Sequence, residues 1–166
     1  MSQEAIEQDT VDTVRMEIRF LTKEELLEEG VVEESLAKEP YRSRTTDAGY
    51  DLYSVQNIVL GPKTSTIVHT GIQIAAPPGY YYTIEGRSSL YMAGIFPNRA
   101  IIDATYTGEA LVSLTNTGDD AYEIKRGERI AQLLIHKQYH AKFDIVKEFS
   151  LCYNQRGMNG FGSTGK

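Results

Sequence analysis

Residues 101–109, Ile-Ile-Asp-Ala-Thr-Tyr-Thr-Gly-Glu, combine side chains that could do chemistry. Two aliphatic residues bring Asp103 to the end of an expected strand, and Tyr106 and Gly108 follow in what the pattern predicts to be a hairpin tip. A carboxylate there can hold a water molecule and accept its proton, while the nearby ring can lie flat against a sugar or a base. Because Asp and Gly are also ordinary turn residues, this stretch alone leaves a purely structural turn open.

A second pair of carboxylates flanks Gly49 at the start of another expected strand. These are Asp47 and Asp51, in the run Asp-Ala-Gly-Tyr-Asp-Leu. A strand-end carboxylate such as Asp51 can hold a hydrated Mg²⁺ through one of its waters. A turn Asp followed by a structural Asp is the alternative.

The run Glu-Gly-Arg-Ser-Ser-Leu at 85–90 places anion-binding groups after a third expected strand. The guanidinium of Arg87 is a forked, permanently charged donor, and Ser88 and Ser89 add hydroxyls that could wrap phosphate oxygens. Either serine could instead cap a short helix reaching Met92. The two interpretations are compatible, because a helix start is itself an anion site.

A single polar residue, Gln132, interrupts the aliphatic run that follows Gly127. A buried amide is costly unless it is paired. We therefore expect Gln132 either to satisfy a neighbouring backbone group or to point into a site.

The C-terminal stretch 156–165 is glycine-rich and reads Arg-Gly-Met-Asn-Gly-Phe-Gly-Ser-Thr-Gly. Glycines let backbone N–H groups approach an anion, Arg156 and Ser163 add donors, and Phe161 offers a face on which a base can stack. A flexible terminus is the alternative, although an aromatic ring and an Arg are unusual in a linker. We expect a lid that orders over a substrate and excludes water.

The elements that must position these groups are expected to be strands. From residue 48 onward, short runs rich in Val, Ile, Thr and Tyr alternate with Gly, Pro, Asn or Asp, as in all-β folds. An alternating run at 14–20 predicts the first strand. The other expected strands are 50–55, 57–60, 65–74, 79–84, 100–103, 109–116, 122–124, 129–137 and 142–146.

The N-terminal part is organised differently. Residues 1–13 are polar and acidic and are expected to form a loose tail. Thr22 and Glu25 form a capping-box pattern that predicts one or two acidic helical turns within 22–39, interrupted by Gly30, with a solvated loop as the alternative. The expected organisation is thus a tail at 1–13, a β-barrel or jelly roll at 14–153 with a short helical insertion, and a C-terminal arm at 154–166.

Composition excludes several classes of protein. The net charge of −6 arises in residues 1–40, which hold 12 acidic and 4 basic side chains, whereas residues 41–166 hold 11 and 13. Neither part has the basic footprint of a nucleic-acid binder. Cys152 is the only cysteine, and no window is apolar enough for a membrane span. We expect a cytoplasmic protein with no nucleic-acid or membrane partner.

Taken together and in order, the five segments resemble the five motifs of the trimeric dUTP pyrophosphatases, the all-β dUTPase family. The resemblance covers roughly residues 45–166. It implies a distorted jelly-roll homotrimer whose active sites are shared between subunits and closed by a neighbour's C-terminal arm. It also implies hydrolysis of dUTP to dUMP and pyrophosphate with Mg²⁺ on the triphosphate.

The resemblance assigns residue roles as well. Asp103 matches the base that orients water for attack on the α-phosphorus, and Tyr106 the ring that packs under the deoxyribose. Asp51 matches a contact to water on Mg²⁺, and Gln132 a contact to metal-bound water or phosphate. The remaining matches are the phosphate contacts Arg87, Ser88 and Ser89, the uracil-reading hairpin residues Asn98, Ala100 and Ile101, and the arm residues Arg156, Phe161, Gly162, Ser163 and Thr164.

This sequence departs from the family pattern at a few positions. Thr107 stands where many members have Arg, Gly86 where many have Pro, and Ser89 where many have Gly. The hairpin between Asn98 and Asp103 is also about one residue shorter than the family pattern. None of these changes removes a catalytic group.

Two rival functions are considered. The dCTP deaminases share the fold and often carry Gly-Arg-Ser-Ser-Leu, but they would need a catalytic Glu where this chain has Leu111, Val112 and Ser113. The other rival is a dUTPase-like trimer that serves as a binding or regulatory protein through residues 1–40. The intact motifs favour catalysis.

Overall fold

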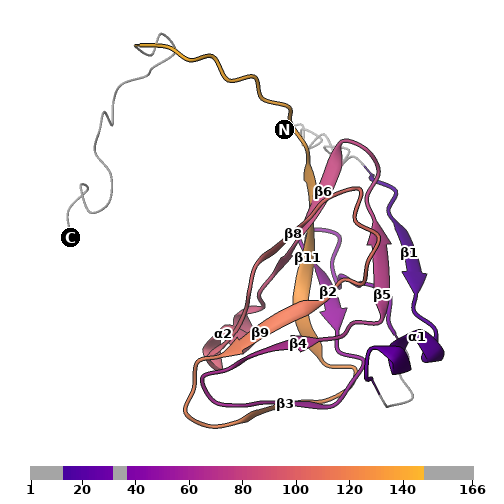
Figure 1. The fold of residues 1–166 in the computed structure, drawn as a ribbon, viewed down its shortest axis with the longest axis vertical. Helices are drawn as coiled ribbons and strands as arrows, with labels where there is room; N and C mark the ends of the chain where they lie inside the picture. Colours follow the sequence, from indigo (N-terminus) through magenta and orange to yellow (C-terminus); the bar gives the residue numbers. More distant parts are fainter. Residues whose placement is uncertain (1–12, 32–36, 148–166) are drawn as a thin grey trace, which may run out of the picture.

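The computed structural model describes residues 13–31 and 37–147 of the 166-residue chain, and the regular elements of this part are mostly strands (Figure 1). No helix within these ranges is long and apolar enough to cross a membrane. The elements are β1 (Glu17–Phe20), α1 (Lys23–Glu28), β2 (Tyr50–Tyr53), β3 (Ile58–Leu60), β4 (Ser65–Val68), β5 (Ile72–Ala75), β6 (Tyr80–Glu85), α2 (Ser88–Met92), β7 (Ile95–Pro97), β8 (Ala100–Ile102), β9 (Val112–Asn116), β10 (Tyr122–Ile124) and β11 (Arg129–Lys137).

The described strands pair in four sheets, all antiparallel. The largest has the order β2-β11-β6-β8, and a second has the order β4-β9-β7. The pairs β1-β5 and β10-β3 complete the set. The sheets pack around one core without closing into a single continuous barrel, which confirms the expected all-β, jelly-roll-like fold.

The core follows from the alternation of apolar residues along the strands. In β9 the inward residues are buried and the outward ones are half-exposed. The largest fully buried side chain is that of Tyr82 in β6, which packs with aliphatic residues of the other strands. Burial of this face fixes the strand register, because a one-residue slip would turn every core residue outward.

The acidic segment near the N-terminus is an integral part of the domain. The capping box is present as predicted: the Thr22 hydroxyl accepts from the Glu25 N–H, and the Glu25 carboxylate accepts from the Thr22 N–H. Leu26 of α1 and Val31 are 2% exposed and pack on the fully buried Val55. β1 pairs with every residue of β5. A solvated loop insertion is therefore the wrong description of residues 21–31.

The expected strands need three corrections: two predictions were wrong, and one strand was not predicted. The expected strand 65–74 is two strands, because Gly71 with φ +69° turns the chain between β4 and β5. β7 was not predicted; it is three residues long and ends in Pro97, which is tolerated because β7 lies at a sheet edge. The predicted strand 142–146 has no pairing partner in the described chain and runs as an extended segment away from the sheets (Figure 1).

The stretch around Asp103 is also not the tip of a hairpin. The strand before it, β8, pairs with β6, whereas the strand after it, β9, pairs with β4 and β7. The loop between them therefore crosses from one sheet to another. Within it, the Tyr106 N–H donates to the Asp103 carbonyl at 3.0 Å, so the expected tight turn is present.

Candidate active site

Three of the sequence motifs converge because β11 lies between β2 and β6. Gln132 in β11 faces Asp51 in β2 on one side and Glu85 in β6 on the other. Arg87 lies two residues after Glu85, at the start of α2. Strand pairing thus brings together residues that lie far apart in the sequence.

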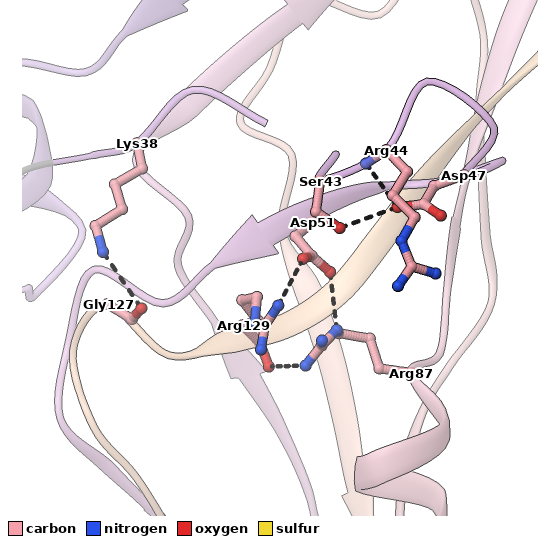
Figure 2. Close-up of polar contacts among 8 residues, drawn as sticks. All are labelled: Lys38, Ser43, Arg44, Asp47, Asp51, Arg87, Gly127 and Arg129. Carbon is pink, nitrogen blue, oxygen red and sulfur yellow. Dashed lines mark hydrogen bonds and ion pairs between the residues drawn. The ribbon is translucent and has the colours of Figure 1, made fainter. Parts of the chain in front are cut away.

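Asp51 is held between two guanidinium groups (Figure 2). Arg87 Nε donates to Asp51 Oδ1 at 2.8 Å, and Arg129 Nη1 donates to Oδ2 at 3.3 Å. Arg87 also donates to the Arg129 carbonyl at 3.4 Å. A β-bulge between Arg129 and Ala131 changes the local register of β11 beside Asp51, a device common next to functional sites. The result is a positively charged cluster built around one carboxylate.

Gln132 joins the three motifs through its side-chain amide. Its Nε2 donates to the carbonyl of Gly86 at 2.6 Å, so the predicted pairing with a backbone group is confirmed. Its amide also lies against Gly49, where a Cβ atom would collide with Gln132 Oε1. Gly49 is therefore required by the close approach of Gln132, and not only by a turn.

These side chains line an open, polar cleft of about 350 Å³. Gln132 is one of the residues that line this cleft, in addition to pairing with the backbone. Other lining residues, which sequence reasoning missed, are Arg42, Ser43 and Arg129. The guanidinium of Arg42 lies 4.9 Å from the centre of the Tyr50 ring. The sequence did contain a signal for Arg42 and Arg129, because these basic residues lie beside or within the runs Asp-Ala-Gly-Tyr-Asp and Glu-Arg-Ile-Ala-Gln.

The serines of the second motif lie in α2, which extends from Ser88 to Met92. Both Ser88 and Ser89 are exposed, and Ser88 lines the same cleft. The predicted serine cap is wrong: the N-cap residue is Arg87, and it makes no capping hydrogen bond through its side chain.

The charged groups of this cleft affect the pKa of a neighbouring tyrosine, Tyr53. The pKa of Tyr53 is raised, first by partial burial of its hydroxyl and then by the negative charge of Asp51. Arg129 and Arg87 act on the same pKa in the opposite direction. The phenol therefore stays neutral beside the charged cluster at physiological pH.

Asp103 lies in a different cleft, of about 420 Å³, together with Ile101, Ala104 and Tyr81. The Asp103 side chain is exposed, and no hydrogen bond or ion pair of its carboxylate is found within residues 13–31 and 37–147. Ile101 is 64% exposed although it belongs to a strand. A carboxylate and an apolar side chain are thus presented together on an open surface.

The two clefts lie at opposite ends of β6. Tyr82 pairs with Ile102, so Asp103 lies beside the first residues of β6, whereas Arg87 follows its last residue. At a rise of about 3.3 Å per residue, six residues of strand separate the two positions by about 20 Å. Within one chain, the backbone positions of Asp103 and Arg87 are therefore widely separated.

The remaining predicted sugar- and base-contact residues lie on different elements, and of these Asn98 contacts β9. The Asn98 N–H donates to the Ser113 carbonyl at 2.8 Å, and its side-chain amide donates to Ser113 Oγ at 2.7 Å. Ala100 is the first residue of β8. Tyr106 is 42% exposed and donates its hydroxyl to the Glu109 carbonyl at 3.1 Å. The predicted arm residues lie outside the described part of the chain; they are Arg156, Phe161, Gly162, Ser163 and Thr164.

Comparison with known proteins decides the family. The sequence model of the dUTPase family matches residues 36–165. This chain belongs to the dUTPase family. The expected family is thereby confirmed, and with it the class of enzyme, dUTP diphosphatase.

Individual relatives agree with this result. A deoxyuridine 5′-triphosphate nucleotidohydrolase of Ehrlichia canis is 39% identical over 131 residues, which cover 76% of this chain and 86% of the relative. One of Kluyveromyces lactis is 40% identical and covers 78% and 88%. Among solved structures, the Staphylococcus bacteriophage 80alpha dUTPase with dUPNHPP has a TM-score of 0.77 and 27% identity, covering 93% of this chain and 100% of that chain.

The described residues offer a divalent cation few ligands of their own. The described residues contain no group of three or more His, Cys, Asp or Glu side chains that could bind a metal. Asp51 is the one carboxylate between two arginines, and Gln132 supplies an amide oxygen nearby. This donor set suits Mg²⁺, which keeps several waters and is commonly bound by one or two carboxylates together with substrate phosphates.

Proposed function

We propose that this protein hydrolyses dUTP to dUMP and pyrophosphate. The observation that carries the proposal is the cleft in which Arg87, Arg129 and Gln132 surround Asp51, in a chain of the dUTPase family. Guanidinium groups bind phosphate oxygens through paired, charge-assisted hydrogen bonds. The cleft supplies such donors from two motifs, through Arg87 and Arg129.

In this proposal, the Arg87 cluster binds the triphosphate. Asp51 orients Arg87 through Nε at 2.8 Å, and Nη1 donates to the Arg129 carbonyl at 3.4 Å, so Nη2 is the guanidinium nitrogen proposed to face a phosphate. The exposed hydroxyls of Ser88 and Ser89 add donors at the start of α2. The arm residues Arg156, Gly162, Ser163 and Thr164 are proposed to complete the phosphate shell, with Phe161 covering the uracil.

Asp103 is proposed as the general base. Its exposed carboxylate can hold a water molecule and accept the proton as the water oxygen attacks the α-phosphorus, after which the bond to the pyrophosphate oxygen breaks. Such a base accounts for about 10²- to 10⁴-fold of the rate. Tyr106 is proposed to pack under the deoxyribose, and the backbone around Asn98, Ala100 and Ile101 to read uracil.

The proposed cofactor is Mg²⁺. When bound with the substrate, it would supply charge neutralisation for the leaving pyrophosphate. Asp51 and Gln132 are the residues proposed to meet it, through its waters.

The proposed active site is shared between copies of the chain, in the homotrimer that the family resemblance implies. A general base must lie within hydrogen-bond reach of the water that it activates. The separation of about 20 Å along β6 therefore supports a site in which Asp103 and the Arg87 cluster come from different subunits. The extended segment 138–147 also supports assembly, because it leaves Phe143 91% exposed and Ile145 fully exposed.

A product assay tests the proposed reaction. Purified protein with Mg²⁺ is given dUTP or dCTP in parallel, and nucleotides and pyrophosphate are resolved. We expect dUMP and pyrophosphate from dUTP alone. Formation of dUTP from dCTP would instead assign the chain to the deaminases, and no product from either nucleotide would favour a binding protein.

A further inference from the structure

The loop that carries Asp103 and Tyr106 needs an anchor outside its flanking strands. It leaves β8 in one sheet and enters β9 in another, so no hairpin pairing fixes its path. Its residues 105–107 are exposed. A functional loop of this kind must be held in place by side-chain contacts if its groups are to act with precision.

The anchor is the side chain of Glu109, which is only 8% exposed. Its Oε1 accepts from the N–H groups of Thr70 and Gly71 at 2.9 and 2.7 Å. Its Oε2 lies 2.8 Å from Nδ1 of His69, whose side chain is 14% exposed. One carboxylate thus binds the whole turn between β4 and β5.

That turn is itself rigidly placed. Gly71 has φ +69°, and a Cβ atom there would lie 2.9 Å from both Ala37 and Val55. The Gly71 carbonyl accepts from the Leu21 N–H at 2.9 Å. The turn therefore lies on the small buried cluster of Leu26, Val31 and Val55, and it offers Glu109 a fixed support.

Glu109 in turn contacts Tyr106 and connects it to the fixed turn. The Tyr106 hydroxyl donates to the Glu109 carbonyl at 3.1 Å, and the ring crosses Gly108, where a Cβ atom would collide with the phenol oxygen. The backbone of Glu109 also forms an antiparallel bridge with Gln73. The chain of contacts runs from the β4–β5 turn through Glu109 to the ring of Tyr106.

We propose that Glu109 is a positioning residue that sets the selectivity for deoxyribose over ribose. This inference rests on the proposed function, in which Tyr106 packs under the sugar. A ring held at a fixed distance from the sugar excludes a 2′-hydroxyl by steric contact. A ring that is free to shift does not exclude it. Glu109 touches no substrate itself and acts through Tyr106.

The informative measurement is the ratio of kcat/KM for dUTP to kcat/KM for UTP. A variant that is merely less stable loses active enzyme equally for both substrates, so its ratio does not change. Glu109→Ala leaves two backbone N–H groups and His69 without their partner, and we expect the ratio to fall at least about tenfold, since small misplacements at a site are costly. Glu109→Gln keeps an oxygen acceptor for Thr70 and Gly71 and should keep the ratio.

Asn116→Ala is the matched control. Asn116 is 1% exposed and forms hydrogen bonds with the backbone of Leu60, Asp120 and Gly118. It is the last residue of β9, at the end of that strand away from the Tyr106 loop. It should lower stability and leave the ratio within about twofold of wild type. If Glu109→Ala does not fold, Tyr106→Phe tests the same link by removing the hydroxyl tether, and the ratio should fall about fivefold.

The two proposals fail in different ways. If the wild type hydrolyses dUTP and the ratio is unchanged in Glu109→Ala, or in Tyr106→Phe where that variant is needed, the positioning role of Glu109 is wrong. If the wild type does not hydrolyse dUTP at all, the proposed function is wrong and this inference falls with it.

Discussion

Two inactive variants of this protein should restore activity when they assemble together. Asp103 and Arg87 lie about 20 Å apart along β6 in one chain, so a shared site must take them from different subunits. We expect Asp103→Asn to lose about 10²- to 10⁴-fold in kcat, as for removal of a general base. Arg87→Ala should lose about 10- to 100-fold in kcat/KM, because it removes charge-assisted hydrogen bonds.

The size of the recovery follows from random assembly. A working site needs its Asp103 from an Arg87→Ala subunit and its Arg87 from an Asp103→Asn subunit. With equal amounts of the two variants, each condition holds for half of the sites, so about one quarter of the sites in a symmetric oligomer are intact. At dUTP concentrations well below KM, the unsorted mixture should therefore show about one quarter of wild-type kcat/KM. Purified trimers that contain both variants should show about one third, because one of the three subunit contacts in each such ring has the required order.

Co-expression with two different affinity tags isolates the mixed oligomers, and pyrophosphate release measures their activity. The matched control pairs Arg87→Ala with Gln132→Leu, since both residues line the same cleft of one chain. That pair should recover nothing, because each subunit lacks one of the two groups. No recovery with the Asp103 pair, or equal recovery with both pairs, would refute the shared-site reasoning.

Three further predictions concern stability. Gln132→Leu leaves the Gly86 carbonyl without its 2.6 Å hydrogen bond and should lower the free energy of unfolding by about 1–3 kcal/mol in urea titrations; a change below about 0.5 kcal/mol would contradict the role of Gln132 as a link between motifs. Leu26→Ala should cost about 2–5 kcal/mol by the same assay, and a neutral effect would show that α1 is not part of the core. Tyr82 has a raised pKa, first through burial and then through Tyr106, so the unfolded chain loses its proton before the folded one. Stability is therefore unaffected by this group below its ordinary pKa of about 10 and falls as pH rises above it, and Tyr82→Phe should flatten the decline of Tm between pH 9 and about 11. An unchanged slope in that variant would remove Tyr82 from the alkaline transition.

Features that depend on contacts between residues close in the sequence could be predicted from the sequence. The capping box at Thr22 and Glu25 is a contact between residues three apart, and the structure contains it as predicted. The alternating run of β9 likewise carries its burial pattern in the sequence.

Strands that depend on a distant pairing strand were harder to predict. Residues 142–146 alternate like a strand, but a strand needs a neighbour for its backbone groups, and the described chain provides none. β7 is a strand only because it pairs with β9, since three residues ending in Pro97 carry almost no pattern of their own.

The sequence by itself determined which groups this protein uses, because carboxylate, guanidinium, amide and phenol chemistry belongs to residue type and survives any fold. The five motifs in their order also sufficed to indicate the family. Only the tertiary structure decided which of these groups meet. Pairing of β11 with β2 and β6 gathers Asp51, Arg87 and Gln132, whereas the antiparallel register of β6 and β8 carries Asp103 to the far end of the same strand. The register of β6 is set by burial of Tyr82 and its neighbours in the core. This burial depends on several strands packing together, so no single motif encodes it.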